Sequence, residues 1–378
     1  MRICVIGGGP AGLYLGTLWK LRHPDDVVEL FEQNASDVTW GFGVVFSDRA
    51  LEFLRADDAQ TVDLIASRMQ TWRDMTLVHR GEKITIDGVG FSAIGRLDLL
   101  TLLLQRAREV GVILHHRTAI KSLDQLPQAD LIVGADGLNS LVRRSFEADF
   151  GASLSYLDNK FVWYGTTKPF DTLTQTFVDT PWGPFNAHHY RYAPGMSTFI
   201  IECARATWIN AGFDTMSEEQ SRQRCEQIFA QALDGHPLVG NHSLWRNFPK
   251  LWCSRWTWRN MALVGDAVHT AHFSIGSGTR LALEDVIALV KALEGHPGDT
   301  RAALAAYDAA RRPIAAKIVE AALTSARWYE NFGEHMKLEP ADFGMSYITR
   351  SGRIDPDKLK AMAPRFVAAY DAAKGLPR

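Results

Sequence analysis

The sequence predicts an α/β fold in which a parallel sheet is interrupted by an inserted antiparallel sheet. A short apolar strand at residues 2–6 runs into a glycine-rich turn and then a helical pattern, and a similar succession returns after residues 261–264. Between these stretches, residues 156–250 contain short strand-like runs that are typical of an antiparallel sheet. The parallel strands therefore come from two separate parts of the chain.

The first glycine-rich turn has the spacing G-x-G-x-x-G, at Gly7, Gly9 and Gly12. Gly7 permits a tight turn, Gly9 lets the backbone approach a pyrophosphate, and Gly12 lets the helix pack close to the strand. The start of the helix also attracts phosphate charge. A second apolar strand ends at Glu32, where a carboxylate can accept hydrogen bonds from ribose hydroxyls. The pattern predicts a dinucleotide site; the alternative is a glycine turn that binds nothing.

Length and composition restrict the class of protein. A chain of 378 residues predicts one large or two interleaved domains. The net charge of −2 gives no reason to expect nucleic acid or an anionic membrane as partner. No apolar run approaches the roughly 18 residues that span a bilayer, and strand one begins too early for a secretory signal. The four cysteines are scattered without a C-x-x-C pair. We expect a cytoplasmic protein without a disulfide framework, a zinc site or another metal.

Three features after the first turn suggest ligand contacts. Residues 40–48 form a loop rich in glycine and aromatic residues, which either lines the ligand crevice or forms an apolar hairpin. Arg96 begins a predicted helix, from which its guanidinium can reach a dinucleotide. Asp136 follows a buried strand at residues 130–133. This aspartate either anchors a loop beside the cofactor or caps the next helix.

The inserted region is predicted to contain four strands, at residues 160–165, 174–178, 185–192 and 197–203. Within the third strand, Asn186, His188, Tyr190 and Tyr192 share one face because strand side chains alternate. This polar and aromatic face is either the floor of a substrate pocket or a solvated outer surface.

A second glycine-rich loop, residues 270–279, enters a helix predicted from residue 280 to 293. The free amides and positive end of such a helix point at one place. Developing negative charge, such as that on the pyrimidine ring of a reduced flavin, needs this environment. His269 and His272 lie three residues apart without a third ligand nearby, so we do not predict a metal site. Alanine-rich helices are predicted at residues 300–336 and 356–373.

The glycine turn, Asp136-Gly137 and Gly265-Asp266, in this order and spacing, resemble the motifs of class A flavoprotein monooxygenases, the family of p-hydroxybenzoate hydroxylase. The resemblance implies a glutathione-reductase-type FAD-binding (Rossmann-like) domain with an interleaved antiparallel-sheet substrate domain and C-terminal helices. The implied limits are 1–155 and 251–340 for the FAD domain, 156–250 for the substrate domain and 341–378 for a helical tail. Part of 70–95 is expected to join the substrate domain.

The resemblance also implies the residues that hold FAD. The ADP half would contact Gly7, Gly9, Gly12 and Glu32. Arg96 and Asp136 would flank the pyrophosphate, and Asp266 would contact the ribityl chain. The amides of Gly278 and Thr279 would face the flavin pyrimidine.

Residues 159–166, 197–203 and 271–276 resemble one subgroup, which includes salicylyl-CoA 5-hydroxylase, the monooxygenase half of 2-aminobenzoyl-CoA monooxygenase/reductase and the violacein-pathway tryptophan hydroxylase. Residues 270–279, 281–285 and 350–354 resemble the aromatic acyl-CoA members more closely. The resemblance implies that NADH or NADPH binds transiently and reduces a tightly bound FAD. Oxygen would then form a flavin C4a-hydroperoxide that hydroxylates an electron-rich ring, with salicylyl-CoA as the expected substrate.

The same resemblance suggests the substrate-site residues. His272, His188 and Tyr190 are expected to be catalytic, with a neutral histidine taking the proton of the ring hydroxyl. Val45, Phe273 and Ser274 are expected to line the pocket. Two alternatives remain open: hydroxylation of a free indole, tryptophan-type or aromatic acid substrate, and a non-catalytic protein on an FAD-type fold. We expect a monomer or a homodimer.

Overall fold

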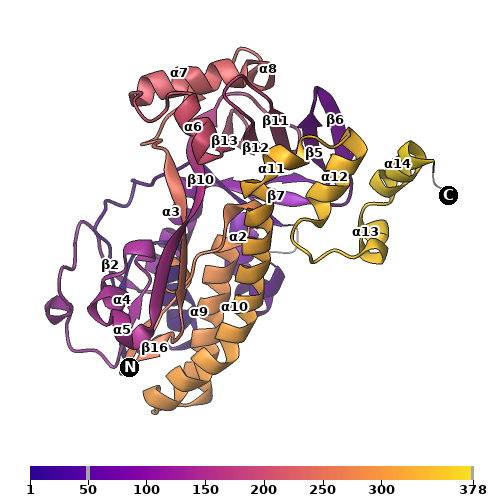
Figure 1. Ribbon diagram of the computed structural model, residues 1–378. Helices are drawn as coiled ribbons and strands as arrows, with labels where there is room; N and C mark the ends of the chain where they lie inside the picture. The colour runs from indigo at the N-terminus through magenta and orange to yellow at the C-terminus, as the bar shows by residue number, and fades with distance from the viewer. Residues whose placement is uncertain (48–51, 376–378) are drawn as a thin grey trace.

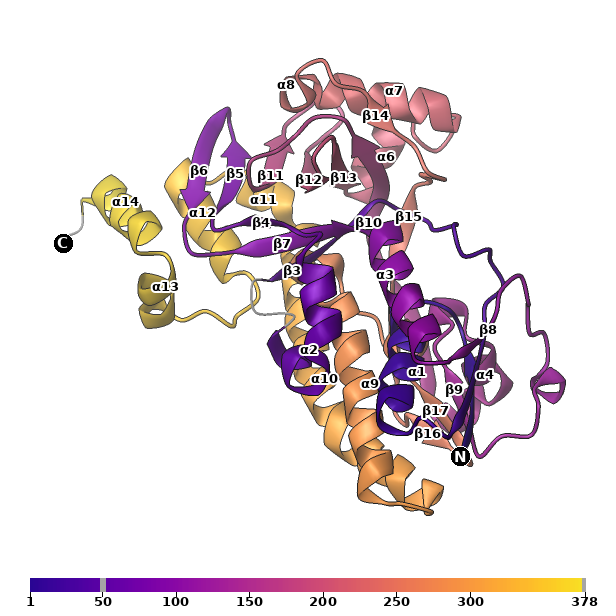
Figure 2. The same cartoon turned by 180° about the vertical axis from the view of Figure 1, so that it is seen from behind.

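The central sheet has six strands in the order β16–β17–β9–β1–β2–β8. The computed structural model describes residues 1–47 and 52–375 (Figures 1 and 2). The strands are β1 (Arg2–Ile6), β2 (Val27–Phe31), β8 (Ile113–His115), β9 (Leu131–Gly134), β16 (Thr257–Trp258) and β17 (Met261–Leu263). β1 pairs in parallel with β2 and β9, and β17 pairs in parallel with β9. The predicted parallel sheet, built from two separate parts of the chain, is confirmed.

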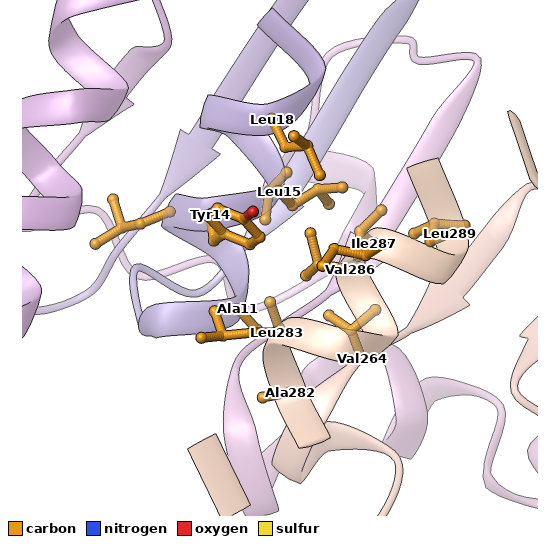
Figure 3. Packing of buried hydrophobic residues seen from close by; sticks show 14 of the residues in the cluster. Ala11, Tyr14, Leu15, Leu18, Val264, Ala282, Leu283, Val286, Ile287 and Leu289 are labelled. Carbon is orange, nitrogen blue, oxygen red and sulfur yellow. The ribbon is translucent and has the colours of Figure 1, made fainter. Parts of the chain in front are cut away.

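Two helices that follow the glycine-rich turns pack against each other. They are α1 (Pro10–Arg22) and α9 (Gly278–Gly295). Figure 3 shows Tyr14 and Leu15 of α1 facing Leu283 and Val286 of α9, and all four side chains are buried. Burial of each such side chain contributes about 1.5–3 kcal/mol. Because both helices start at the same end of the sheet, their packing brings the two glycine-rich turns together.

The second sheet has the order β14–β10–β13–β12–β11–β5–β6, with β15 also paired to β10. Its strands are β5 (Met75–His79), β6 (Glu82–Ile86), β10 (Ala152–Thr166), β11 (Leu173–Val178), β12 (Phe185–Ala193), β13 (Met196–Cys203), β14 (Leu238–Val239) and β15 (Arg246–Cys253). The four strands predicted in the inserted region are confirmed as parts of β10 to β13. β5 joins this sheet in parallel with β11, and β10 runs without a break through residue 155. The division into domains stays a prediction.

Both faces of this antiparallel sheet are covered. Helices α6 (Arg205–Asn210), α7 (Glu218–Ile228) and α8 (Ala230–Leu233) lie over one face. The opposite face carries Asn186, His188 and Tyr190, which are 1%, 4% and 2% exposed. It packs against the C-terminal helices and the second glycine-rich loop. The alternative of a solvated outer face is therefore wrong for these three residues.

A small third sheet corrects the expectation for residues 40–48. β3 (Gly43–Ser47) pairs antiparallel with β7 (Phe91–Gly95), which also pairs with β4 (Gln70–Trp72). Half of the predicted loop is therefore a strand, and its partner lies far along the chain, not in a local hairpin. Residue 48 lies outside the described residues. The sequence did not indicate this pairing because its partners lie more than forty residues apart.

The remaining helices link and cover the sheets. They are α2 (Glu52–Ala66), α3 (Arg96–Glu109), α4 (Leu141–Ser145), α5 (Glu147–Phe150), α10 (Thr300–Glu330), α11 (Phe332–His335), α12 (Pro340–Thr349), α13 (Pro356–Met362) and α14 (Pro364–Lys374). The long helix α10 runs from the parallel sheet toward the antiparallel sheet (Figure 1). In the described part of the chain, no helix has both the length and the hydropathy needed to cross a membrane.

Candidate functional site

A cavity of about 520 Å³ opens at the carboxyl ends of the parallel strands. Gly7 follows β1, Glu32 follows β2, and Asp266 lies shortly after β17. Ligands of such sheets bind at this edge. The predicted cofactor residues that line the cavity are Gly7, Gly9, Glu32, Arg96, Asp136, Asp266, Gly278 and Thr279. Gly12, the remaining one, lies behind the turn and has a packing role.

The three glycines of the first turn differ in what surrounds them. Gly7 has φ +108°, and a Cβ there would lie 2.4 Å from the carbonyl oxygen of Ala135. A Cβ on Gly12 would lie 2.0 Å from the carbonyl oxygen of Gly7. These two positions are required by the fold itself. A Cβ on Gly9, in contrast, would meet nothing within 4 Å, so this glycine leaves room where a ligand's phosphates would lie.

Glu32 is held in place by two backbone amides. Its Oε2 accepts a hydrogen bond from the Gly8 amide and its Oε1 accepts one from the Asn34 amide, both at 2.7 Å. Each oxygen has a further lone pair available. The carboxylate is therefore fixed at the cavity wall and is able to accept hydrogen bonds from a pair of ribose hydroxyls.

Asp136, Arg96 and Asp266 occupy the middle of the cavity. Asp136 accepts a hydrogen bond at 2.6 Å from the Leu141 amide at the start of α4, while its buried Oδ1 has no partner among the described residues. Burial raises the pKa of Asp136. The Arg96 Nε donates to Thr39 Oγ1 at 3.1 Å. Burial lowers the pKa of Arg96, and nearby Asp266 opposes that shift. The Arg96 cation suits the negative charge of a pyrophosphate, and the unpartnered Asp136 oxygen is able to accept a hydrogen bond from the polar chain attached to it.

The loop that carries Asp266 is fixed from α9 by one buried carboxylate. Asp285 Oδ2 accepts hydrogen bonds from the Gly265 amide at 3.0 Å and from His269 Nε2 at 2.9 Å. Its Oδ1 accepts one from Arg311 Nε at 2.7 Å. Asp285 and Arg311 are 0% and 5% exposed. His269, considered above for metal binding, is thus committed to Asp285. The described residues contain no group of three or more possible metal ligands.

The start of α9 presents free backbone donors to the cavity. Its N-cap, Ser277, makes no side-chain capping hydrogen bond. A Cβ on Gly278 would meet nothing within 4 Å. The helix has 18 residues, long enough for a substantial dipole. The amides at Gly278 and Thr279 therefore favour negative charge on a ligand at this end of the cavity, as expected for the pyrimidine end of a flavin.

His272 and Phe273 of the same loop belong to an aromatic group, which we call the Phe273 cluster, together with Phe161 of β10, His188 of β12 and Phe248 of β15. The Phe273 ring centroid lies 4.2 Å from that of His272, 5.2 Å from that of Phe161 and 5.5 Å from that of His188. Phe248 contacts both His272 and Phe273. The structure thus brings together two of the predicted catalytic residues and one predicted pocket residue.

His272 has a defined hydrogen-bonding state. Burial, His188 and Arg350 lower the pKa of His272 to about 3, so the ring is neutral at physiological pH. Its Nδ1 accepts a hydrogen bond from the Ser274 amide at 3.3 Å. A neutral imidazole that accepts at one nitrogen carries its proton on the other. His272 therefore presents an Nε2–H donor, a geometry that favours hydrogen-bond donation over the base role expected from the sequence.

Of the other predicted substrate residues, His188 belongs to the Phe273 cluster, while Tyr190, Val45 and Ser274 do not. Burial and Arg350 lower the pKa of His188 to about 3. The Tyr190 hydroxyl donates to the Gly43 carbonyl at 2.9 Å, which ties β12 to β3. Val45 packs beside Gly276 of the second loop. The Ser274 hydroxyl is bonded to Ser325 Oγ of α10 at 2.9 Å. Tyr190 and Ser274 thus use their hydroxyls within the protein.

Two residues near the Phe273 cluster had no predicted role. Glu202 lies on β13 opposite Phe161 and Asn186; burial raises its pKa to about 8, and Asn159 Nδ2 donates to its Oε1 at 2.8 Å. The sequence signal for it was a glutamate directly after the apolar run 199–201 of a predicted strand. Arg350 follows α12 and reaches the Ser274 carbonyl. It lies within a stretch that the sequence singled out only as a motif.

Comparison with known proteins identifies the family of this chain. The sequence profile of the family described as FAD binding domain matches residues 124–322. Salicyloyl-CoA 5-hydroxylase of Streptomyces sp is 39% identical over 98% of this chain and 73% of its own. Protodeoxyviolaceinate monooxygenase of Chromobacterium violaceum is 33% identical over 94% of this chain and 96% of its own.

Solved structures show the same fold. A tetrameric form of 2-methyl-3-hydroxypyridine-5-carboxylic acid oxygenase superposes with a TM-score of 0.73 at 19% identity, covering 96% of this chain and 95% of its own. PqsL of P. aeruginosa, in complex with 2-aminobenzoylacetate, gives 0.70 at 20% identity, with coverages of 87% and 96%.

Proposed function

Because this chain belongs to the FAD-dependent aromatic monooxygenases of the FAD binding domain family, we propose that it hydroxylates an aromatic ring held as an acyl thioester. Salicylyl-CoA, hydroxylated at C5, is the leading substrate, and NADH or NADPH is the electron donor. FAD held by the residues of the cavity would supply the redox chemistry, in which one oxygen atom of O2 enters the ring and the other leaves as water.

One observation supports the proposal most strongly: a single loop contributes residues both to the lining of the cofactor cavity and to the Phe273 cluster. Gly278 and Thr279 line the cavity, while His272 and Phe273 lie in the Phe273 cluster a few residues earlier. An aromatic substrate at the cluster would therefore lie beside the end of the cavity that favours negative charge. His188 and His272 are buried and the three phenylalanines of the cluster are half-buried, so the cluster would also limit the access of water to the reacting ring.

The charge of this region favours a thioester over a free acid. His188 and His272 are neutral at physiological pH, and Glu202, with its pKa of about 8, is mostly protonated. The positive charge that acts on both histidines is that of Arg350. A salicylyl thioester with an ionised hydroxyl carries one negative charge at the ring, whereas salicylate in the same state carries two. Burying an unpaired second charge costs several kcal/mol.

Within this proposal the site residues have distinct roles. His272 donates from Nε2 to the oxygen substituent of the ring, and Phe273 packs against the ring itself. His188 lies on the sheet floor as a neutral partner for the same substituent. Tyr190 supports β3, because its hydroxyl is bonded to Gly43. Val45 and Ser274 fix the shape of the second loop.

The substrate class is tested by NADH oxidation in the presence of salicylyl-CoA, salicylate or an indole. We expect salicylyl-CoA to stimulate oxidation and to gain one oxygen atom. Stimulation by salicylate or the indole alone would instead favour the free acid or indole alternative. A purified protein without bound flavin would support a non-catalytic role on the same fold.

Removing the donor of His272 should lower kcat/KM for the thioester. His272→Leu loses one hydrogen bond, worth about 1–3 kcal/mol when the partner is buried, which corresponds to roughly 5–150-fold. His272→Gln keeps an amide donor and should retain most of the activity. Steady-state kinetics measures both, with the flavin absorption spectrum as control. Equal losses in the two variants would contradict the donor role.

A further inference from the structure

Arg350 connects the C-terminal helices to the loop that carries the Phe273 cluster. Its Nη2 donates to the Ser274 carbonyl at 2.8 Å, and its Nε donates to Ser325 Oγ at 3.0 Å. Its Nη1 donates to the Tyr347 carbonyl at 2.7 Å. Ser274 and Ser325 are also bonded to each other through their hydroxyls. The guanidinium thus ties together the second loop, α10 and the end of α12.

The hydrogen bonds of Arg350 go to uncharged oxygens, so its positive charge is not neutralised through them. The guanidinium carbon lies 3.8 Å from the ring centroid of Tyr347 and 5.7 Å from that of Tyr329. The positive charge of Arg350 acts on His188 of β12 and His272 of the second loop, and the guanidinium lies over the rings of Tyr329 of α10 and Tyr347 of α12. Both histidines are neutral, and burial raises the pKa of Tyr329 so that it also stays uncharged.

An aromatic ring that enters the Phe273 cluster would therefore meet one positive charge among neutral groups. An electron-rich ring reacts faster when its hydroxyl is ionised, because the oxygen then donates more electron density. A cation within a few ångströms favours the ionised form and typically lowers the pKa of an acid by 1–3. The His272 Nε2–H adds a hydrogen bond that also stabilises a negatively charged oxygen.

We propose that Arg350 is a positioning residue that fixes the Ser274 loop and supplies the positive charge favouring the ionised ring hydroxyl of a bound aromatic thioester. The proton is released to the buffer when the substrate binds. This inference rests on the proposed function, since it concerns the substrate of the same site. It assigns a role to the C-terminal stretch 350–354, which lies outside the residues matched by the FAD binding domain family.

The test uses the FAD-bound enzyme without NAD(P)H, so that no turnover occurs. Salicylyl-CoA is bound to the wild type and to two variants, and the phenolate absorbance of the bound thioester is followed against pH. Arg350→Lys keeps the charge but not the three-way hydrogen bonding. Arg350→Gln keeps a donor for the Ser274 carbonyl but removes the charge. The flavin spectrum and the thioester Kd at low pH control for folding and binding.

We expect the bound hydroxyl in the wild type to ionise at least about one pH unit below that of free salicylyl-CoA. Arg350→Lys should keep most of this shift, and Arg350→Gln should lose it while still binding the thioester at low pH. If the ring hydroxyl bound to Arg350→Gln ionises at the same pH as in the wild type, the inference about Arg350 is wrong and the proposed function is unaffected. If Arg350→Gln does not retain FAD, the test rests on Arg350→Lys. A hydroxyl that ionises in this variant at the same pH as in free salicylyl-CoA would overturn the inference. Failure of the wild type to bind salicylyl-CoA would overturn the proposed function and, with it, this inference.

Discussion

Replacing Asp285 by Asn is expected to lower the free energy of unfolding by about 1.5–3 kcal/mol, the range for losing buried hydrogen bonds to a charged group. The amide would remove one of the two carboxylates that pair with the buried Arg311 guanidinium, the one at 2.7 Å, and would leave Glu284 at 2.8 Å as the other. It would also weaken the hold on the Gly265 amide and His269. Urea denaturation followed by circular dichroism measures the loss, with and without added FAD.

The matched control is Asp308→Asn, which removes the partner of Arg312 on α10. That pair is partly exposed, with Arg312 at 40%, so the expected loss is below about 1 kcal/mol. An Asp285→Asn protein as stable as this control would show that Asp285 of α9 does not stabilise the fold through its buried hydrogen bonds.

The contribution of Asp285 also has a defined pH dependence. Burial alone would raise the pKa of Asp285, but His269 and Arg311 outweigh burial and hold it below the usual 3.8. A carboxyl group whose pKa is lowered in the folded state stabilises the fold above its unfolded pKa. This stabilisation is lost as the pH falls from about 4 through the folded pKa. The Asn variant should lack that part of the acid transition.

Gly9→Asp is expected to abolish FAD binding while the fold is kept, with a loss in affinity of at least about 10³-fold, or 4 kcal/mol. A side chain at this position meets no protein atom, and Gly9 is the N-cap of α1. Aspartate is among the best N-cap residues, so the helix should not be weakened. Its negative charge, however, would enter the space of the phosphates. Flavin absorbance after purification and a titration of FAD against the FAD-free protein measure the effect.

Two further variants separate the ligand from the fold. Gly9→Ala adds no charge and should bind FAD better than Gly9→Asp. Gly12→Ala should lose stability, because its Cβ would overlap the Gly7 carbonyl. A Gly9→Asp protein that purifies with bound flavin would show that the phosphates do not lie at this turn.

The cofactor cavity was predictable from the sequence because its requirements are local. A tight turn at Gly7 and the close contact at Gly12 allow no side chain, so these positions appear as a spacing in the chain. The same is true of Asp136 and Asp266, which follow directly from the ends of buried strands. The alternation of residues 185–192 also predicted which side chains share a face.

The substrate end was less predictable because it depends on contacts between distant segments. The pairing of β3 with β7 and the bonds of Arg350 to Ser274 and Ser325 join residues that no local pattern connects. The proton position on His272 follows from one backbone amide of its own loop. The sequence predicted a substrate role for His272, but it could not indicate which of the two ring nitrogens carries the proton. The face of the sheet that carries Asn186 and Tyr190 is buried because the C-terminal helices cover it, and the sequence pattern did not indicate this packing.

The central claim is that the FAD cavity and the Phe273 cluster form one site that oxygenates an aromatic thioester. It is tested most directly by incubating the holoenzyme with salicylyl-CoA, NADH or NADPH, and ¹⁸O2, followed by mass spectrometry of the thioester. We expect one ¹⁸O atom in the ring of the product, with consumption of one reduced nicotinamide per product. Nicotinamide oxidation that yields only hydrogen peroxide and unchanged salicylyl-CoA would contradict it.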